Sequence, residues 1–132
     1  MKYSNGNKYE GYWKNDQMHG RGIYNWKSGE KYDGDWKKNI RNGKGKFTWP
    51  SGDTYDGDWI DDKKNGNAIM KNAKGEIYEG HYKDGYRDGK GIYNWTSGEK
   101  YDGEWKNSKR NGKGFNLWPS GNTYDGYWID NK

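Results

Sequence analysis

The sequence predicts an all-β fold: an elongated single-sheet solenoid of consecutive antiparallel β-hairpins, with no helices. Three observations support this. A Tyr-acid-Gly-x-Trp/Tyr segment recurs every 23 residues, the tryptophans keep fixed positions within that period, and large or glycine residues alternate with charged ones. Alternation with a period of two is typical of strands, and a fixed period in this range is typical of repeat architectures. Glycine recurs in every unit and no segment shows a 3.6-residue apolar stripe, so helices are not expected.

The repeat runs through the chain without insertions. The recurring segment begins at Tyr9, Tyr32, Tyr55, Tyr78, Tyr101 and Tyr124. All nine tryptophans fall in two positions of the period: Trp13, Trp36, Trp59, Trp105 and Trp128 in the first, and Trp26, Trp49, Trp95 and Trp118 in the second. Such regular placement indicates one structural role for each position.

One unit shows the expected elements in order. Residues 30–36 alternate as a strand, residues 37–42 connect, residues 43–49 alternate as a second strand, and residues 50–52, Pro-Ser-Gly, turn into the next unit. Position 39 recurs as Asp, Asn, Gly or Ser, most of which tolerate the left-handed backbone of a turn. With Trp36 set opposite Gly43, the polar face would pair Asp33 with Lys46 and Asp35 with Lys44.

The core must be aromatic. Only 28% of the residues are hydrophobic, against roughly 45–50% in typical globular domains. Nine Trp, thirteen Tyr and two Phe can each bury roughly 150–250 Å², however, if one layer collects them. A strand glycine lets a neighbouring ring lie across the backbone, and stacked units then bury what a single unit cannot.

The chain is expected to form a single domain, 1–132, made of two related three-unit blocks, 1–69 and 70–132. Residues 1–63 match residues 70–132 at 39 of 63 positions without gaps. The third unit departs from the pattern, because Ala68 replaces a repeat glycine and Asn72 and Tyr82 replace tryptophans. We expect a kink near residues 66–82.

These units resemble the MORN repeat, in which Tyr-x-Gly-x-Trp is followed by a turn with glycine, Gly-x-Gly, and a further glycine before the next tyrosine. The resemblance covers nearly the whole chain, and Gly85 matches the turn glycine. It implies a scaffolding, tethering or dimerising module that contacts protein partners, anionic lipids or cytoskeletal structures. The fold itself specifies no substrate.

No pattern for catalysis or metal binding stands out, so no enzymatic activity, cofactor or metal site is expected. His19 and His81 are the only histidines and lie in different positions of the repeat, while Ser28 and its equivalents precede turn glycines without a histidine at a fixed offset. The Gly43-Lys44-Gly45 segment lacks the strand-loop-helix setting of phosphate-binding loops. The absence of cysteine excludes disulfides and thiolate metal sites.

The repeat aromatics form the first candidate interaction surface. Tyrosine and tryptophan are enriched where proteins meet partners, so an incompletely closed ring layer would bind a helical or extended peptide. The alternative is that most of these rings are simply core. The candidates are Tyr9, Trp13, Trp26, Tyr32, Trp36, Trp49, Tyr55, Trp59, Tyr78, Tyr82, Trp95, Tyr101, Trp105, Trp118, Tyr124 and Trp128.

The hairpin tips form the second candidate surface. The six tip segments (14–19, 37–42, 60–65, 83–88, 106–111 and 129–132) carry a net charge of +6, against −1 for the rest of the chain. They would line one long basic edge that attracts an anionic membrane or an acidic protein segment, or that only discourages aggregation. Nucleic acid is not the expected partner, because few aromatics interleave with these charges. The edge residues are Lys37, Lys38, Arg41, Lys63, Lys64, Arg87, Lys106, Lys109 and Arg110.

Two functions therefore remain open: an interaction scaffold that binds protein partners, or a peripheral membrane adaptor. Terminal strands without caps suggest a homodimer through the ends of an array about 50 Å long. The first thirty residues have no apolar signal region, and no apolar run reaches the roughly 20 residues that span a bilayer. We expect a cytoplasmic protein, and association with membranes or the cytoskeleton is the open alternative.

Overall fold

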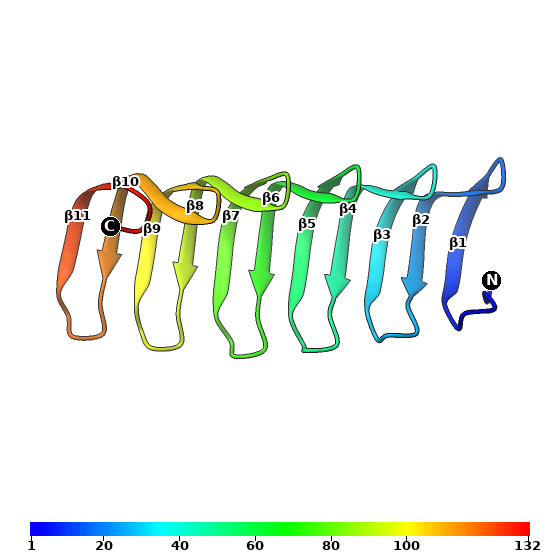
Figure 1. Ribbon diagram of the computed structural model, residues 1–132, viewed down its shortest axis with the longest axis horizontal. Coiled ribbons are helices and arrows are strands. Elements are labelled where there is room, and N and C mark those ends of the chain that lie inside the picture. The colour runs from blue at the N-terminus through cyan, green and yellow to red at the C-terminus, as the bar shows by residue number, and fades with distance from the viewer.

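The computed structural model describes all 132 residues as one antiparallel sheet of eleven strands in sequence order (Figure 1). The strands are β1 (Lys8–Lys14), β2 (Gln17–Asn25), β3 (Lys31–Lys37), β4 (Ile40–Thr48), β5 (Thr54–Ile60), β6 (Lys63–Lys71), β7 (Ile77–Lys83), β8 (Tyr86–Asn94), β9 (Lys100–Lys106), β10 (Lys109–Leu117) and β11 (Thr123–Trp128). The predicted all-β hairpin array is confirmed. No segment forms a helix long and apolar enough to cross a membrane.

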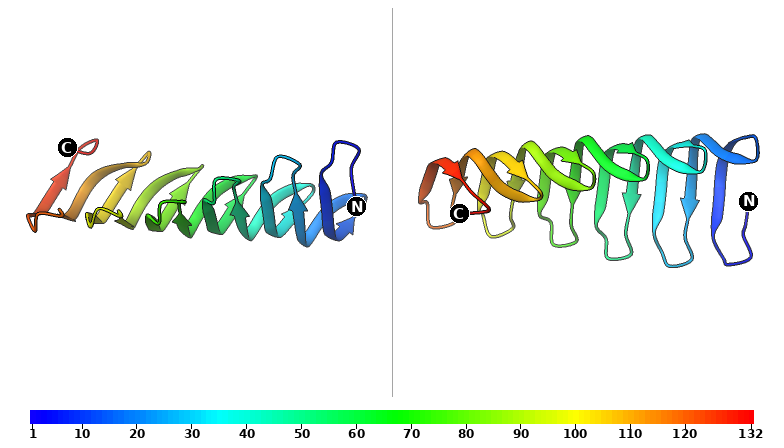
Figure 2. Two further views of the ribbon diagram at one scale, coloured as in Figure 1. Left: turned by 90° about the horizontal axis from the view of Figure 1, so that it is seen from below. Right: turned by 45° about the horizontal axis from the view of Figure 1, so that its top comes forward.

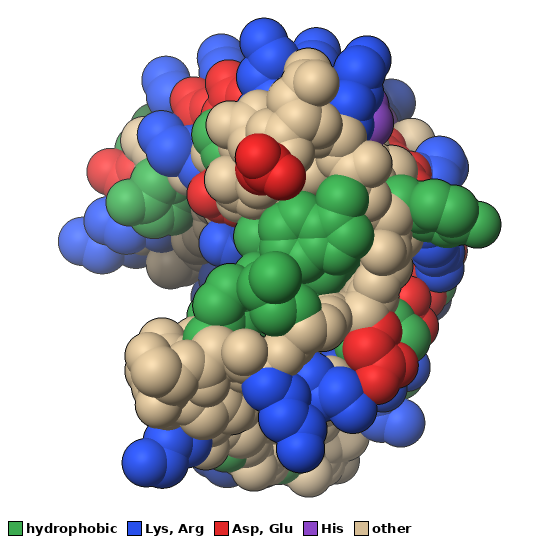
Figure 3. Space-filling view, turned by 90° about the vertical axis from the view of Figure 1, so that its right-hand side faces the viewer, with side chains coloured by type: hydrophobic (Ala, Val, Ile, Leu, Met, Phe, Trp, Pro, Cys, Tyr) green, Lys and Arg blue, Asp and Glu red, His purple; other side chains and the backbone are tan.

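The units stack along one axis, with the two termini at opposite ends (Figure 2). Viewed along that axis from the β1 end, the molecule is hollowed on one side, and hydrophobic side chains lie along the hollow (Figure 3). Each hairpin therefore contributes one curved segment to an open groove that runs the length of the array.

The hairpin tips are shorter than the sequence suggested. Residues 37–42 were expected to form a connection, but β3 continues to Lys37 and β4 begins at Ile40. Only Lys38 and Asn39 form the turn, with φ of 49° and 69°. Two consecutive left-handed residues are typical of the tight turn that matches the twist of antiparallel strands. The turn between units is as expected, since the Gly52 amide donates to the Trp49 carbonyl at 3.0 Å.

Each hairpin contains a register shift that the sequence did not reveal. In β3 and β4, Gly34 lies opposite Gly45. The next pair towards the hairpin turn is Trp36 with Arg41, so β4 advances by four residues where β3 advances by two. The expected pairing of Trp36 with Gly43 inside the hairpin is therefore wrong. Asp33 does lie opposite Lys46. Such irregularities bend a strand and increase its twist, which is consistent with the curved hairpins of the groove.

The repeat tyrosine packs flat over a pair of glycines. Tyr32 is fully buried, and its hydroxyl donates to the Asp35 carbonyl at 2.9 Å. A Cβ atom built on Gly45 would stand 2.2 Å from the Tyr32 hydroxyl oxygen and 2.3 Å from the ring carbon that carries it. Glycine at position 45 is thus favoured by close packing rather than by a turn.

The repeat tryptophan joins neighbouring units. The Trp36 ring packs edge-on against Tyr32 of its own unit, with centroids 5.0 Å apart, and against Tyr9 of the preceding unit, at 5.8 Å. Its indole nitrogen donates to the Gly22 carbonyl at 3.1 Å. The equivalent bonds run from Trp59, Trp105 and Trp128 to Gly45, Gly91 and Gly114. Each of these contacts stabilises one interface between units.

The third unit keeps the register of the others. Strands β5 to β8 pair as their equivalents do and are evenly spaced in Figure 1, so the kink expected near residues 66–82 is not seen. Tyr82 occupies the tryptophan position and packs edge-on between Tyr55 and Tyr78, at 5.3 Å from each. Having no indole N–H, it cannot make the bond to the preceding unit. We call the region around Asn72 and Tyr82 the seam.

At the N-terminal edge, the first residues fold back along β1. The Tyr9 amide donates to the Met1 carbonyl at 2.8 Å, and Lys2 forms an isolated bridge with Lys8. This segment covers part of the free edge of β1. The homodimer through terminal strands stays a prediction.

Replacing Gly45 by alanine is expected to lower the free energy of unfolding by about 1–3 kcal/mol, because the added methyl displaces the Tyr32 ring from a packed layer. Urea unfolding followed by far-ultraviolet circular dichroism measures the change. Ala68 occupies the equivalent position of the third unit, where alanine is already accommodated. Ala68→Gly should therefore change stability by only about 1 kcal/mol or less. An unchanged urea midpoint for Gly45→Ala would contradict the packing role of the glycine.

Candidate partner-binding groove

The sixteen predicted aromatic residues occupy three environments. Ten are buried core: Tyr9, Tyr32, Trp36, Tyr55, Trp59, Tyr78, Tyr82, Tyr101, Trp105 and Trp128. Two, Trp13 and Tyr124, belong to the end units and are 40% and 42% exposed. The remaining four are half-buried: Trp26, Trp49, Trp95 and Trp118. We call these four the groove tryptophans, because they pack on the core while leaving part of each ring accessible.

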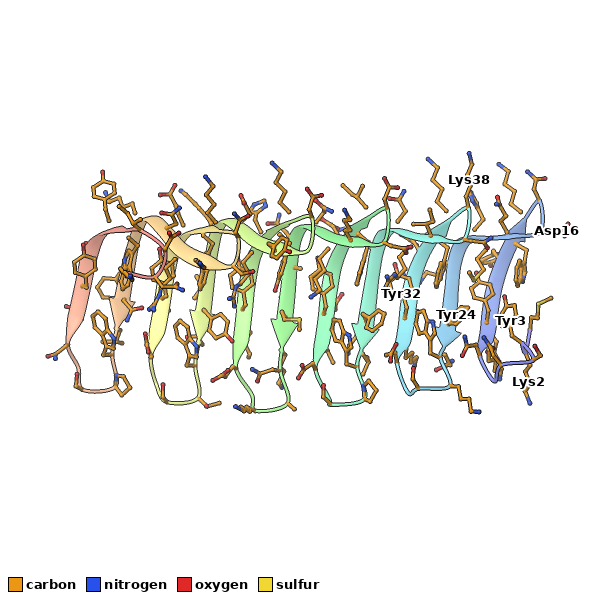
Figure 4. All side chains as sticks on the ribbon, viewed as in Figure 1. Lys2, Tyr3, Asp16, Tyr24, Tyr32 and Lys38 are labelled. Carbon is orange, nitrogen blue, oxygen red and sulfur yellow. The ribbon has the colours of Figure 1, made fainter.

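A second row of side chains supports the groove tryptophans. The rings of Tyr24, Phe47 and Tyr93 lie 4.4, 4.5 and 4.2 Å from those of Trp26, Trp49 and Trp95. Figure 4 shows Tyr24 and Tyr32 on the neighbouring strands β2 and β3 and Tyr3 in the segment before β1, whereas Lys38 extends from a hairpin tip.

The predicted aromatic face does not include this second row. Tyr24, Phe47, Met70 and Tyr93 share one position of the 23-residue period, so a signal was present. The fifth member of the series, Asn116, is polar and fully buried.

The nine predicted basic residues do not form one edge. Five are exposed: Lys37, Lys38, Lys63, Lys106 and Lys109. Four turn inward and lie over aromatic rings; we call Arg41, Lys64, Arg87 and Arg110 the inner cations. The charged group of Arg41 lies 4.7 Å from the centre of the Trp59 ring, and that of Lys64 lies 5.1 Å from the centre of Trp49. The charged groups of Arg87 and Arg110 each lie 4.6 Å from a ring centre, that of Trp105 and that of Trp128. Cations at this distance from a ring face are stabilised by the ring quadrupole.

Strand geometry explains why the predicted basic edge is divided between two faces. Lys63 and Lys64 are neighbours at the start of β6, and Lys109 and Arg110 are neighbours at the start of β10. Consecutive strand residues point to opposite faces. One cation of each pair therefore faces solvent, and the other faces the groove.

Two of the inner cations have anionic or amide partners. Arg41 forms an ion pair with Asp62 of the next turn, Nε to Oδ1, at 3.0 Å. Arg110 forms an ion pair with Glu99 at 3.1 Å and also donates to the side-chain oxygen of Asn116 at 3.0 Å. These contacts fix both guanidinium groups and compensate their charge.

The other two inner cations, Lys64 and Arg87, form no ion pair. Arg41 and Lys64 hold the same position of the repeat, and so do Asp62 and Gly85. Lys64 therefore has a glycine where Arg41 has Asp62, and glycine offers no acceptor side chain. The Arg87 guanidinium donates from Nη2 to the Ser108 carbonyl at 2.9 Å, but its Nε is buried without a hydrogen-bond partner. Burial lowers the pKa of Lys64, and the nearby positive charges of Arg87 and Arg41 lower it further, while the Asp53 carboxylate raises it by a smaller amount.

A pocket of about 300 Å³ opens beside these two cations. We call it the seam pocket; its lining includes Lys64, Met70, Asn72, Tyr82, Gly85 and Arg87. It exists because Asn72 and Gly85 are smaller than the Trp, Asp, Asn or Ser of the equivalent positions.

Two carboxylates also line the seam pocket. Asp53 accepts from the Ala73 amide at 2.8 Å, and Glu76 accepts from the Asn72 side chain at 2.8 Å. Both are therefore held by the turn between units. No group of three or more His, Asp and Glu side chains is arranged to hold a metal ion.

Comparison with known families agrees with this geometry. The family model of the MORN repeat matches five consecutive segments, residues 9–31, 32–54, 55–77, 78–100 and 101–123. These segments cover most of the chain, and each begins at a repeat tyrosine of the core. No curated protein matches the chain.

Proposed function

Because the chain belongs to the MORN repeat family, whose repeats mediate interactions with proteins or membranes, we propose that it is a non-enzymatic scaffold that binds a peptide segment of a partner protein along its groove. The observation that carries this proposal is the row of half-buried groove tryptophans, Trp26, Trp49, Trp95 and Trp118. Partly exposed aromatic side chains on a concave surface are typical of interface hot spots, where a partner completes their burial.

The spacing of the groove suits a peptide. Each unit contributes two strands, which advances the array by about 10 Å at the usual strand separation. A peptide in the polyproline II conformation rises about 3.1 Å per residue with three residues per turn, so every third residue would face an equivalent position of the next unit. The seam, where Asn72 replaces a tryptophan, interrupts this regular series and would distinguish one register of the partner from another.

The membrane-adaptor alternative is weakened by the split of the basic residues. Of the nine predicted basic residues, five lysines remain exposed to an anionic surface, and acids such as Asp61 and Asp84 lie at the same tips. Each basic residue near an anionic membrane contributes about 1 kcal/mol. A cytoplasmic location is part of our proposal, and fractionation of cells that express the chain tests it.

Selection of a displayed peptide library on the intact chain tests the peptide function. Selected peptides should lose at least about 30-fold in affinity for the Trp26→Ala and Trp95→Ala variants, because hot-spot tryptophans contribute about 2 kcal/mol or more. Tyr12→Ala and Tyr127→Ala are the matched controls, since these rings are 71% and 74% exposed. Fluorescence anisotropy measures each affinity.

Two outcomes would reject the proposal. The first is equal loss of affinity in the groove variants and in the Tyr12 and Tyr127 controls. The second is failure to select peptides combined with sedimentation of the chain with phosphatidylserine vesicles but not with phosphatidylcholine vesicles. If glutamine substitution of the exposed lysines then abolished sedimentation, the membrane-adaptor function would replace the peptide function.

A further inference from the structure

We propose that the seam pocket is a carboxylate-binding site, and that the partner segment is therefore acidic and presents an Asp or Glu side chain to Lys64 and Arg87. This inference rests on the proposed peptide function and names the chemistry of the partner. It is carried by three features of this chain: a pocket, two inner cations without ion pairs, and a buried donor without an acceptor.

The pocket is a local departure from a regular repeat. In four other units the position of Asn72 carries a groove tryptophan, and the position of Gly85 carries Asp, Asn or Ser. Two smaller side chains at neighbouring positions leave about 300 Å³ open in the middle of the groove. This is the lower end of the volume range of small-ligand pockets, and it is ample for one acidic side chain.

The cations of the pocket lack ion pairs although two carboxylates, Asp53 and Glu76, line the same pocket. Arg41 is paired with Asp62 and Arg110 with Glu99, whereas Asp53 and Glu76, at the repeat position of Glu99, accept from the turn between units and form no ion pair. Lys64 and Arg87 have no such partner, and the buried Nε of Arg87 leaves a desolvated donor unsatisfied. An unmet buried donor costs about 1–3 kcal/mol, and more when the group is charged. A carboxylate that accepts from this Nε and from the Lys64 ammonium recovers that cost, because guanidinium and carboxylate groups match in geometry.

The position of the pocket favours a protein over a lipid headgroup. Lys64 and Arg87 lie on β6 and β8 and face the hollow side of the array, where they pack against Trp49, Trp105 and other rings. A flat bilayer would meet the exposed tips and the rims before it reached this concave floor. A single polypeptide segment is narrow enough to lie inside the groove and place a side chain in the pocket.

The test uses a fluorescein-labelled oligo-glutamate peptide and an oligo-glutamine peptide of equal length, with binding to the intact chain measured by fluorescence anisotropy. Oligo-glutamate should bind and oligo-glutamine should not. Replacing both Lys64 and Arg87 by glutamine should weaken oligo-glutamate binding at least tenfold. The matched control replaces Lys63 and Lys109 by glutamine, which removes the same charge from exposed positions, and should change affinity less than about threefold through long-range electrostatics alone. Equal losses in the two double variants would overturn the proposal.

Gly85→Asp separates binding from folding. The variant places a carboxylate at the repeat position from which Asp62 forms its ion pair with Arg41. The side chain has room, because no atom lies within 4 Å of a Cβ built on Gly85. Gly85 has φ of 90° and Asp62 has φ of 68°, so the chain already holds aspartate in this left-handed turn position. The variant should keep or raise the urea midpoint and should lose at least tenfold in oligo-glutamate affinity. Unchanged affinity would overturn the carboxylate site.

Failure of this inference can be distinguished from failure of the proposed function. If selected peptides depend on Trp26 and Trp95 but not on Lys64, Arg87 or Gly85, the peptide groove stands and the carboxylate site does not. If phosphatidylserine vesicles bind the chain and binding is lost in the Lys64 and Arg87 double variant, a lipid headgroup occupies the pocket and the peptide assignment is overturned.

Discussion

Replacing Trp105 by alanine will lower the free energy of unfolding by about 3–5 kcal/mol, a large part of the stability of a chain this size. Trp105 is 4% exposed, packs edge-on between Tyr101 and Tyr78, and donates its indole N–H to the Gly91 carbonyl at 3.0 Å. Its removal leaves a cavity and an unpaired carbonyl at the interface between two units. In a linear array each unit contacts only its neighbours, so no distant contact compensates this loss.

Trp13→Ala is the matched control, because Trp13 holds the same repeat position in an end unit. It is 40% exposed, its ring packs only against Tyr9, and its indole donates to no carbonyl. We expect a smaller loss, about 2 kcal/mol, because part of the ring is already exposed. Urea unfolding followed by far-ultraviolet circular dichroism compares the two variants without relying on tryptophan fluorescence. Similar losses for Trp105→Ala and Trp13→Ala would show that the contacts between units contribute little.

Sequence periodicity was sufficient to predict the hairpin array, since every unit repeats the same alternation and the same glycines. It was not sufficient to predict how far each strand extends. The left-handed pair Lys38 and Asn39 closes the hairpin in two residues, and lysine is not a residue type that signals such a turn. The predicted six-residue connection was therefore too long.

The error in turn length caused the error in the candidate site. A six-residue connection over 37–42 leaves Arg41 and its equivalents outside the strand alternation and predicts that all tip cations share one edge. Because β4 begins at Ile40, Arg41 follows the alternation of the strand and faces the rings. The groove tryptophans belong to the predicted aromatic face, but their partial exposure depends on packing that periodicity does not describe.

The substitutions at the seam are visible in the sequence, but they produce a pocket and not the predicted kink. Ala68, Asn72 and Tyr82 change side-chain volume, whereas the register of β6 and β7 depends on backbone hydrogen bonds that these residues still make. Missing volume in a sheet held by its backbone appears as a pocket rather than as a kink. Interiors are close-packed, so such a void is informative about function.

Raising the pH from about 10 towards 12 will unfold the chain cooperatively. Burial raises the pKa of Tyr82 to about 12, and it raises the pKa of Tyr32, Tyr55 and Tyr78 even further above the usual value. In the unfolded chain these tyrosines lose protons near pH 10. Their contribution to stability is fully present below pH 10 and is lost as the pH rises, by about 1.4 kcal/mol per pH unit for each tyrosine.

Four such tyrosines together give a slope of about 5 kcal/mol per pH unit, enough to exhaust a typical stability of about 5–15 kcal/mol within a few pH units. The lowered pKa of Lys64 acts in the opposite sense, but only for one group and only below about pH 10.5. Tyrosinate absorbance and circular dichroism should therefore change together. Tyr82→Phe removes one titrating group and should reduce the slope by about 1.4 kcal/mol per pH unit. Complete ionisation of the tyrosines with a native circular dichroism spectrum would show that water reaches these rings in the folded chain.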